Sequence, residues 1–87
     1  MGLISWREFV KGELANARKK HGSYTSAHEA YAVLLEEVDE FWEEVRFKRQ
    51  HRDPARMLRE LVQIATVAER AAYDLKLIEE VPECSEP

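Results

Sequence analysis

The chain has 87 residues, the length of one small domain, and such a domain buries only about 60% of its unfolded surface and benefits from oligomerisation. It is 45% hydrophobic and 34% charged with 3 Gly and 3 Pro, which argues against disorder and against a turn-rich β fold. Its formal net charge of -4 gives no reason to expect binding to nucleic acid or to an anionic membrane. We therefore expect an all-α protein.

The sequence favours a cytoplasmic protein. Its single cysteine, Cys84, lies in a polar tail and cannot form an internal disulfide. No apolar run is long enough to span a bilayer, and Arg7 and Glu8 interrupt the region where a secretory signal would be apolar. We expect residues 1–81 to form one helical domain and residues 82–87 a disordered tail.

The first predicted helix begins after Ser5 and runs to about Lys20. Ser5 is a suitable N-cap, and Glu8 stands three residues later, where it completes a capping box. His21 and Gly22 end the helix. Its last turn is basic, which complements the helix dipole and also suits phosphate contact. The apolar side consists of Trp6, Phe9, Val10 and Leu14.

The second predicted helix runs from Ala27 to about Arg49. Ser26 or Thr25 can cap it, with Glu29 placed to bond back. Its apolar positions alternate by four and three, the spacing of a helical-bundle seam. We expect this stripe to lie in the core, with Leu35 and Trp42 widening it. The seam consists of Ala27, Tyr31, Leu34, Val38, Phe41 and Val45.

The third predicted helix runs from Pro54 to about Glu79, after a loop at residues 50–53. Asp53 followed by Pro54 is a strong helix start. The segment Leu61–Ala68 is apolar on nearly all sides, so it requires packing partners on nearly all sides. Small residues, which allow close helix approach, follow along this helix. We therefore expect an antiparallel bundle completed by homo-oligomerisation, as a dimer that forms a four-helix-type bundle.

An acidic cluster lies beside the apolar stripe of the second helix. Glu37 and Glu40 share one side of that helix, and Glu60 and Gln63 have the same spacing on the third. If the two helices pack antiparallel, these pairs can face each other. Three carboxylates and one amide oxygen then form a site suited to Mg²⁺ or Mn²⁺. The alternative interpretation is a solvated acidic face without a metal.

The order Glu36-Glu37-x-x-Glu40, followed by Glu60-x-x-Gln63, resembles the EExxE…ExxD signature of the MazG-like all-α nucleoside triphosphate pyrophosphohydrolases. The resemblance covers roughly residues 26–75. It implies a dimeric or tetrameric helical bundle that hydrolyses a (d)NTP to its monophosphate and pyrophosphate with Mg²⁺. By the same resemblance Glu37, Glu40 and Glu60 are expected metal ligands. Glu36 is an expected accessory ligand or a catalytic base that orients water.

Gln63 departs from the family pattern, which has Asp at this position. An amide oxygen can bind Mg²⁺ but adds no negative charge, so metal affinity should fall. The alternative function is therefore a catalytically inactive helical dimerisation or nucleotide-binding module on the same scaffold. A third interpretation is an interaction protein that binds an acidic partner through the basic segment 46–59.

Three basic residues follow the second helix and are candidates to hold the triphosphate: Lys48, Arg49 and Arg52. They can equally form salt bridges with Glu43, Glu44 or a partner chain. Aromatic residues of the second helix can stack on a base, but their helical spacing is more typical of a core. The sequence has no P-loop, and its histidines lack the spacing of a zinc site.

Overall fold

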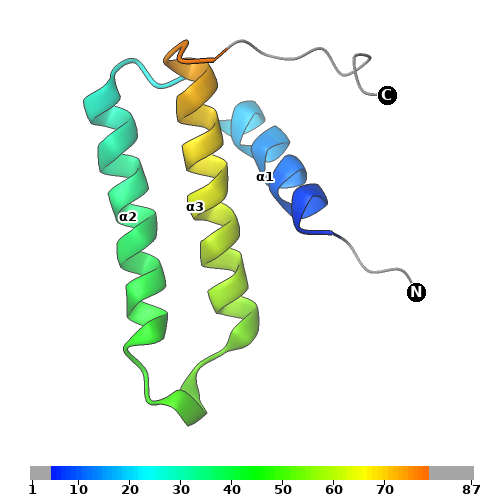
Figure 1. The fold of residues 1–87 in the computed structure, drawn as a ribbon, viewed down its shortest axis with the longest axis vertical. Coiled ribbons are helices and arrows are strands. Elements are labelled where there is room, and N and C mark those ends of the chain that lie inside the picture. Colours follow the sequence, from blue (N-terminus) through cyan, green and yellow to red (C-terminus); the bar gives the residue numbers. More distant parts are fainter. Residues whose placement is uncertain (1–4, 79–87) are drawn as a thin grey trace.

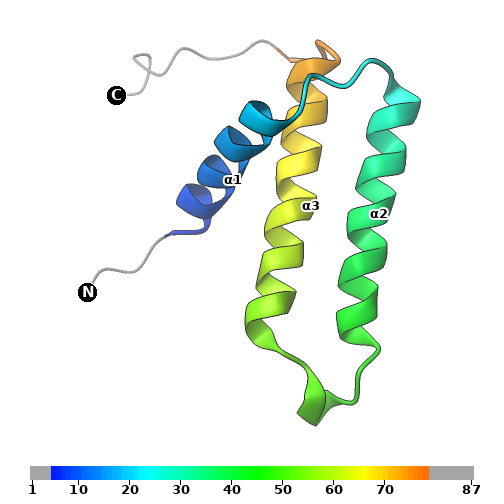
Figure 2. The same ribbon diagram turned by 180° about the vertical axis from the view of Figure 1, so that it is seen from behind.

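The computed structural model describes residues 5–78, and this part of the chain contains three α-helices and one short 3-10 helix but no strand. The helices are α1 (Trp6–Lys20), α2 (Ala27–Val45), η1 (Arg49–His51) and α3 (Pro54–Asp74). Figure 1 shows α2 and α3 side by side and antiparallel, with α1 inclined across the other side of α3. The reverse view confirms that α3 is the central helix (Figure 2). The all-α prediction is therefore confirmed, whereas the predicted tail and Cys84 lie outside the described residues.

The predicted N-caps of α1 and α2 are confirmed by their hydrogen bonds. Ser5 Oγ accepts from the backbone N–H of Glu8 at 3.2 Å, and the Glu8 carboxylate accepts from the N–H of Ser5 at 3.0 Å. Ser26 caps α2 by accepting from the N–H of Glu29 at 3.0 Å. The Glu29 carboxylate then accepts from the N–H of Thr25 at 2.7 Å. Local hydrogen bonds therefore determine where both helices begin.

The end of α2 differs from the prediction. The helix ends at Val45 and does not reach Arg49, and the connection to α3 spans residues 46–53 with η1 inside it. The Arg52 Nε–H donates to the carbonyls of Val45 at 3.1 Å and Phe47 at 3.2 Å. The last carbonyls of a helix lack intrahelical partners, so this side chain stabilises an early helix end.

α3 begins as predicted and ends before the predicted Glu79, which itself lies outside the described residues. The N–H of Lys76 bonds to the carbonyl of Tyr73 at 3.0 Å, and the N–H of Leu77 bonds to that of Ala72 at 3.0 Å. These two bonds form a Schellman motif. The motif requires a left-handed residue, and Lys76 supplies it with φ 61°. Glycine usually occupies such a position, so the sequence carried no signal for this helix end.

The core lies where α2, α3 and the α1–α2 connection meet. Tyr24, Ala30 and Val67 are its buried members, and half-buried apolar side chains of α2 and α3 pack around them. Thr66 is only 1% exposed, and its hydroxyl donates to the carbonyl of Val62 at 2.8 Å. The buried hydroxyl group is thereby satisfied within α3.

The predicted apolar stripe of α2 is only partly covered in the single chain. Leu35, Val38 and Trp42 are 43%, 42% and 55% exposed, contrary to the expectation that they lie in the core. α3 packs instead against the neighbouring side of α2, where Ala30 is buried and Glu37 is half-buried. Small residues near the N-terminal end of this side of α2 allow α3 to approach closely, which explains why α3 packs here and not on the predicted apolar stripe.

Two charged residues of α3 attach the α1–α2 connection to the bundle. Arg70 donates to Tyr24 Oη at 3.1 Å and to the carbonyl of Gly22 at 2.8 Å. Asp74 accepts from the backbone N–H of Tyr24 at 3.1 Å and pairs with Arg18 at 3.5 Å. Because these contacts join segments about 50 residues apart, they fix where α2 starts relative to α3.

The left-handed conformation of Lys76 predicts that Lys76→Gly stabilises the protein. Removal of the Cβ relieves an unfavourable backbone conformation, so the free energy of unfolding should rise by about 0.5–1 kcal/mol. In a domain of this size the change corresponds to roughly 2–8 °C in Tm by calorimetry. Lys76→Ala, which removes the amine but keeps the Cβ, is the matched control and should give no gain. An equal gain in both variants would assign the effect to the lysine charge.

Candidate metal centre

Three carboxylates from α2 and α3 meet at one place between the helices. Glu37 and Glu40 come from α2 and Glu60 from α3, and one oxygen of each lies within 4.8 Å of the others. The antiparallel packing of α2 and α3 (Figure 1) brings Glu60 close to Glu37 and Glu40, as expected. Oxygen atoms at this separation can share one hard divalent cation, and exposed acidic groups also cluster without one.

Burial and the repulsion between neighbouring carboxylates raise the pKa values of Glu37 and Glu60. Burial and, after it, the negative charges of Glu40 and Glu60 together raise the pKa of Glu37 to about 7. The pKa of Glu60 is also raised, first by burial and then by Glu40. A carboxylate with a raised pKa is destabilised in its charged form. The folded chain therefore favours a proton or a cation at this cluster.

The two remaining members of the predicted site lie beside the cluster. Glu36 is exposed on α2, and its charge contributes to the raised pKa of Glu37. Gln63 is half-buried on α3, one turn after Glu60, and it lines a cleft together with Glu37. The motif residues thus divide into a compact triad, one exposed acid and one amide at the edge of a cleft.

This cleft has a volume of about 600 Å³ and is bordered by all three helices and by the α1–α2 connection. Glu37 and Gln63 lie towards one end, and Arg70 and His21 lie towards the other. Along α3 the distance from Gln63 to Arg70 is about 10 Å, since an α-helix rises about 1.5 Å per residue. The volume of the cleft falls within the range of about 300–1,000 Å³ that is typical of small-molecule sites.

The basic residues predicted to hold phosphate lie beyond the end of α2, and all are exposed. Lys48 and Arg49 form no side-chain ion pair within residues 5–78, whereas the Nε–H of Arg52 is used to cap α2. The expected salt bridges to the acidic end of α2 are made by other residues. Arg46 pairs with Glu43 at 3.0 Å and Arg56 pairs with Glu44 at 3.8 Å.

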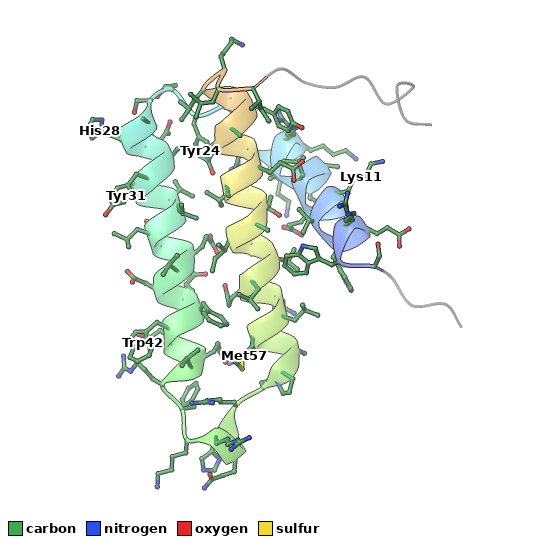
Figure 3. All side chains as sticks on the ribbon, in the orientation of Figure 1. Lys11, Tyr24, His28, Tyr31, Trp42 and Met57 are labelled. Carbon is green, nitrogen blue, oxygen red and sulfur yellow. The ribbon has the colours of Figure 1, made fainter. Side chains whose placement is uncertain are left out.

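The aromatic residues of α2 do not face the cleft. Tyr31 and Trp42 are 64% and 55% exposed, and Figure 3 shows both on the side of α2 away from α3. The expectation that they are core residues is therefore wrong for the single chain, while Phe41 is half-buried. Tyr24, which the sequence analysis did not consider, instead lies between the upper ends of α2 and α3 (Figure 3).

Arg70 is the functional candidate that sequence reasoning missed. It is 6% exposed, stacks on the Tyr24 ring at 4.3 Å, and lines the cleft. Burial raises the pKa of Tyr24 above its ordinary value, and the charge of Arg70 opposes this shift. The one signal in the sequence was the position of Arg70 within an Ala-rich segment of the third helix. A long charged residue in a segment that packs closely is rarely buried without a partner, so this position indicated a special role.

Comparison with protein-family models, with curated proteins and with solved structures gave no match. The family resemblance of the two acidic motifs thus stays a prediction. Within residues 5–78, no helix combines the length and the apolar character needed to cross a bilayer.

The raised pKa of Glu37 predicts a pH dependence of stability. The native carboxyl, with a pKa of about 7 against an ordinary 4.5, binds its proton more tightly than the unfolded one. The free energy of unfolding should therefore fall as pH rises through this interval. In Glu37→Gln this fall should be smaller, as measured by urea unfolding between about pH 5 and pH 8 with EDTA.

Asp39→Asn is the matched control, since Asp39 is an exposed acid of the same helix outside the cluster. It should keep the pH dependence of the native chain. An unchanged pH dependence in Glu37→Gln would show that Glu37 is not destabilised in its charged form.

Proposed function

We propose that this chain is a cytoplasmic nucleoside triphosphate pyrophosphohydrolase of the MazG-like type that requires Mg²⁺ or Mn²⁺. The reaction converts a (d)NTP and water into a (d)NMP and pyrophosphate. The observation that carries the proposal is the triad of Glu37, Glu40 and Glu60, whose oxygens lie within 4.8 Å of one another. These residues belong to both halves of the acidic signature, so the fold joins the parts that the resemblance requires.

The donor set fits a hard divalent cation. Glu37, Glu40 and Glu60 would hold it, because carboxylate oxygens are the preferred ligands of Mg²⁺ and Mn²⁺. The raised pKa of Glu37 supports this assignment, since a nearby cation would relieve the repulsion among the acids. When bound, such a cation neutralises phosphate charge and lowers the pKa of water.

The chain's own residues then perform the remaining steps. Glu36 is exposed beside the triad and can accept a proton from the attacking water. Water adds to the α-phosphorus, and the bond to the bridging oxygen breaks to release pyrophosphate. Lys48 and Arg49 have no ion pair within residues 5–78, so their charges are available to the leaving group. The Nε–H of Arg52 is bonded to the carbonyls of Val45 and Phe47.

The cleft beside Glu37 and Gln63 is the proposed place for the nucleoside. Its volume of about 600 Å³ suits a small molecule, and Glu37 of the triad lines it. Gln63 lines it with an amide that can both donate and accept hydrogen bonds. This position allows Gln63 to contact either the cation or the substrate.

A binding module without catalysis is the second candidate, and Gln63 is the observation that favours it. The amide contributes no negative charge where the family signature has Asp, so a cation would be bound by three charged ligands and a neutral one. Such a site can hold a nucleotide without hydrolysing it. The two candidates differ in turnover and agree in requiring the triad.

The chain is also proposed to form a homo-oligomer, a dimer or a tetramer. Exposed apolar side chains form a surface on α2, with Leu35 and Val38 at 43% and 42% exposure. Contiguous apolar surface on a small domain commonly marks an interface. A second copy that covers this surface would complete the bundle predicted from the third helix.

The proposed activity predicts pyrophosphate release from at least one member of a panel of NTPs and dNTPs with Mg²⁺ or Mn²⁺. Glu40→Gln should abolish release, because it removes one charged ligand of the triad, whereas Asp39→Asn should keep it. Gln63→Asp should lower the metal concentration required for half-maximal activity. Metal-independent release, or full activity in Glu40→Gln, would contradict the proposed mechanism.

Native protein that binds nucleotide and Mn²⁺ but releases no pyrophosphate would support the binding module. Activity that appears only in Gln63→Asp would show that catalysis was lost at this position.

The proposed oligomer predicts that Leu35→Arg dissociates the native assembly. A charge in the apolar surface should shift the mass measured by light scattering to that of one 10.2 kDa chain. His28→Arg is the control, as His28 is exposed on the same helix and already polar. A native mass of one chain would contradict the proposal.

A further inference from the structure

Arg70 is a buried positive charge whose hydrogen bonds, within the described residues, go only to neutral oxygens. It is 6% exposed, and within residues 5–78 it forms no ion pair with a carboxylate. Its two terminal nitrogens donate to neutral oxygens, those of Tyr24 and Gly22, and its Nε–H has no acceptor. Buried charges in proteins are normally paired, because an unpaired one loses hydration without compensation. The contact with the Tyr24 ring offsets only part of this cost.

A small hollow adjoins this guanidinium at the end of the bundle that carries the α1–α2 connection. It has a volume of about 160 Å³ and is lined by Arg18, His21, Gly22, Ser23, Arg70 and Asp74. This volume equals that of about five water molecules in the liquid, which suits an anion of four or five heavy atoms and is too small to enclose a whole nucleotide.

Positive groups and hydrogen-bond donors outnumber negative groups around this hollow. The single carboxylate, that of Asp74, already accepts from Arg18 and from the N–H of Tyr24. The backbone N–H groups of Gly22 and Ser23 have no acceptor within residues 5–78. Guanidinium and backbone N–H groups together form the usual donor set for a phosphate group.

We infer that the hollow between Arg70, Arg18 and His21 is a binding site for a small oxyanion, with a phosphate group as the ligand. The anion compensates the buried charge of Arg70 and accepts hydrogen bonds from the connection at residues 21–23. The site lies about 15 Å along α3 from Glu60, so it is separate from the carboxylate triad. It requires no cation, and its existence does not depend on the proposed hydrolase activity.

The inference is tested by thermal unfolding of the full chain with EDTA, in which inorganic phosphate replaces chloride at constant ionic strength. A ligand that binds the native state raises Tm in a saturable way. His21→Ala and Arg18→Gln should each weaken phosphate binding by about tenfold, the usual effect of losing one charge-assisted hydrogen bond. Arg70→Met should abolish binding if it folds, and the other two variants decide the question if it does not.

Lys19→Gln is the matched control, because it removes one positive charge from the same turn of α1 at an exposed position outside the hollow. Its phosphate affinity should equal that of the native chain. Equal losses of phosphate affinity in Lys19→Gln and His21→Ala would show that binding depends only on the overall charge, and would overturn the inference. A native Tm that does not change between phosphate and chloride would also overturn it.

The same measurement distinguishes two sources of the phosphate group. If the native ligand is a free anion, inorganic phosphate binds at least as tightly as a nucleoside monophosphate. If the phosphate belongs to a larger molecule, the monophosphate binds more tightly and its advantage is lost in His21→Ala. The second result is geometrically possible because the hollow shares His21, Gly22, Ser23 and Arg70 with the larger cleft.

Discussion

The antiparallel contact between α2 and α3 is the interaction on which the rest of the structure depends. It buries Ala30 and Val67 in the core and places Glu37 opposite Glu60 within the same interface. The contact therefore includes charged groups as well as apolar ones, and burial together with the neighbouring carboxylates raises the pKa of Glu37 to about 7. Packing energy from the apolar end of the interface must offset this cost, since desolvated like charges destabilise a fold.

The register of that contact is fixed from the opposite end of the molecule. Arg70 and Asp74 hold Tyr24 and its neighbours against α3, and α2 begins directly after this attached segment. Because both charged side chains are buried, the attachment is specific as well as stabilising. A shift of α2 by one turn would move Glu37 by about 5.4 Å and separate it from Glu60. The attachment of Tyr24 by Arg70 and Asp74 thus affects the position of the carboxylate triad, because α2 connects the two.

The sequence predicts the local features of this fold well. Helix starts depend on hydrogen bonds within four residues, and the caps at Ser5 and Ser26 could be recognised from residue types alone. The approach of Glu37, Glu40 and Glu60 could be predicted on the condition that the two helices pack antiparallel, because helical spacing puts Glu37 and Glu40 on one side of α2.

The remaining features depend on contacts that spacing does not encode. The end of α2 is set by Arg52 from beyond the helix, and the end of α3 by a left-handed lysine where glycine is usual. Periodicity also does not choose between two adjacent faces of α2. The apolar stripe through Leu35 and Trp42 is exposed because α3 selects the neighbouring face, which has smaller residues at its start. That choice depends on the shape of the partner helix.

Local rules of sequence and structure are broken most clearly at two places where charges lie close to like charges or are buried without an opposite charge. Acidic groups gather at Glu37, Glu40 and Glu60, and the guanidinium of Arg70 is buried without an ion pair to any residue of 5–78. Folds retain such arrangements when a ligand uses them, since each costs stability in the free protein. The two arrangements have opposite charge, and one member of each, Glu37 and Arg70, lines the same cleft. A ligand set that satisfied both would consist of a cation at one end and an oxyanion at the other, and this complementarity joins the two proposals on physical grounds alone.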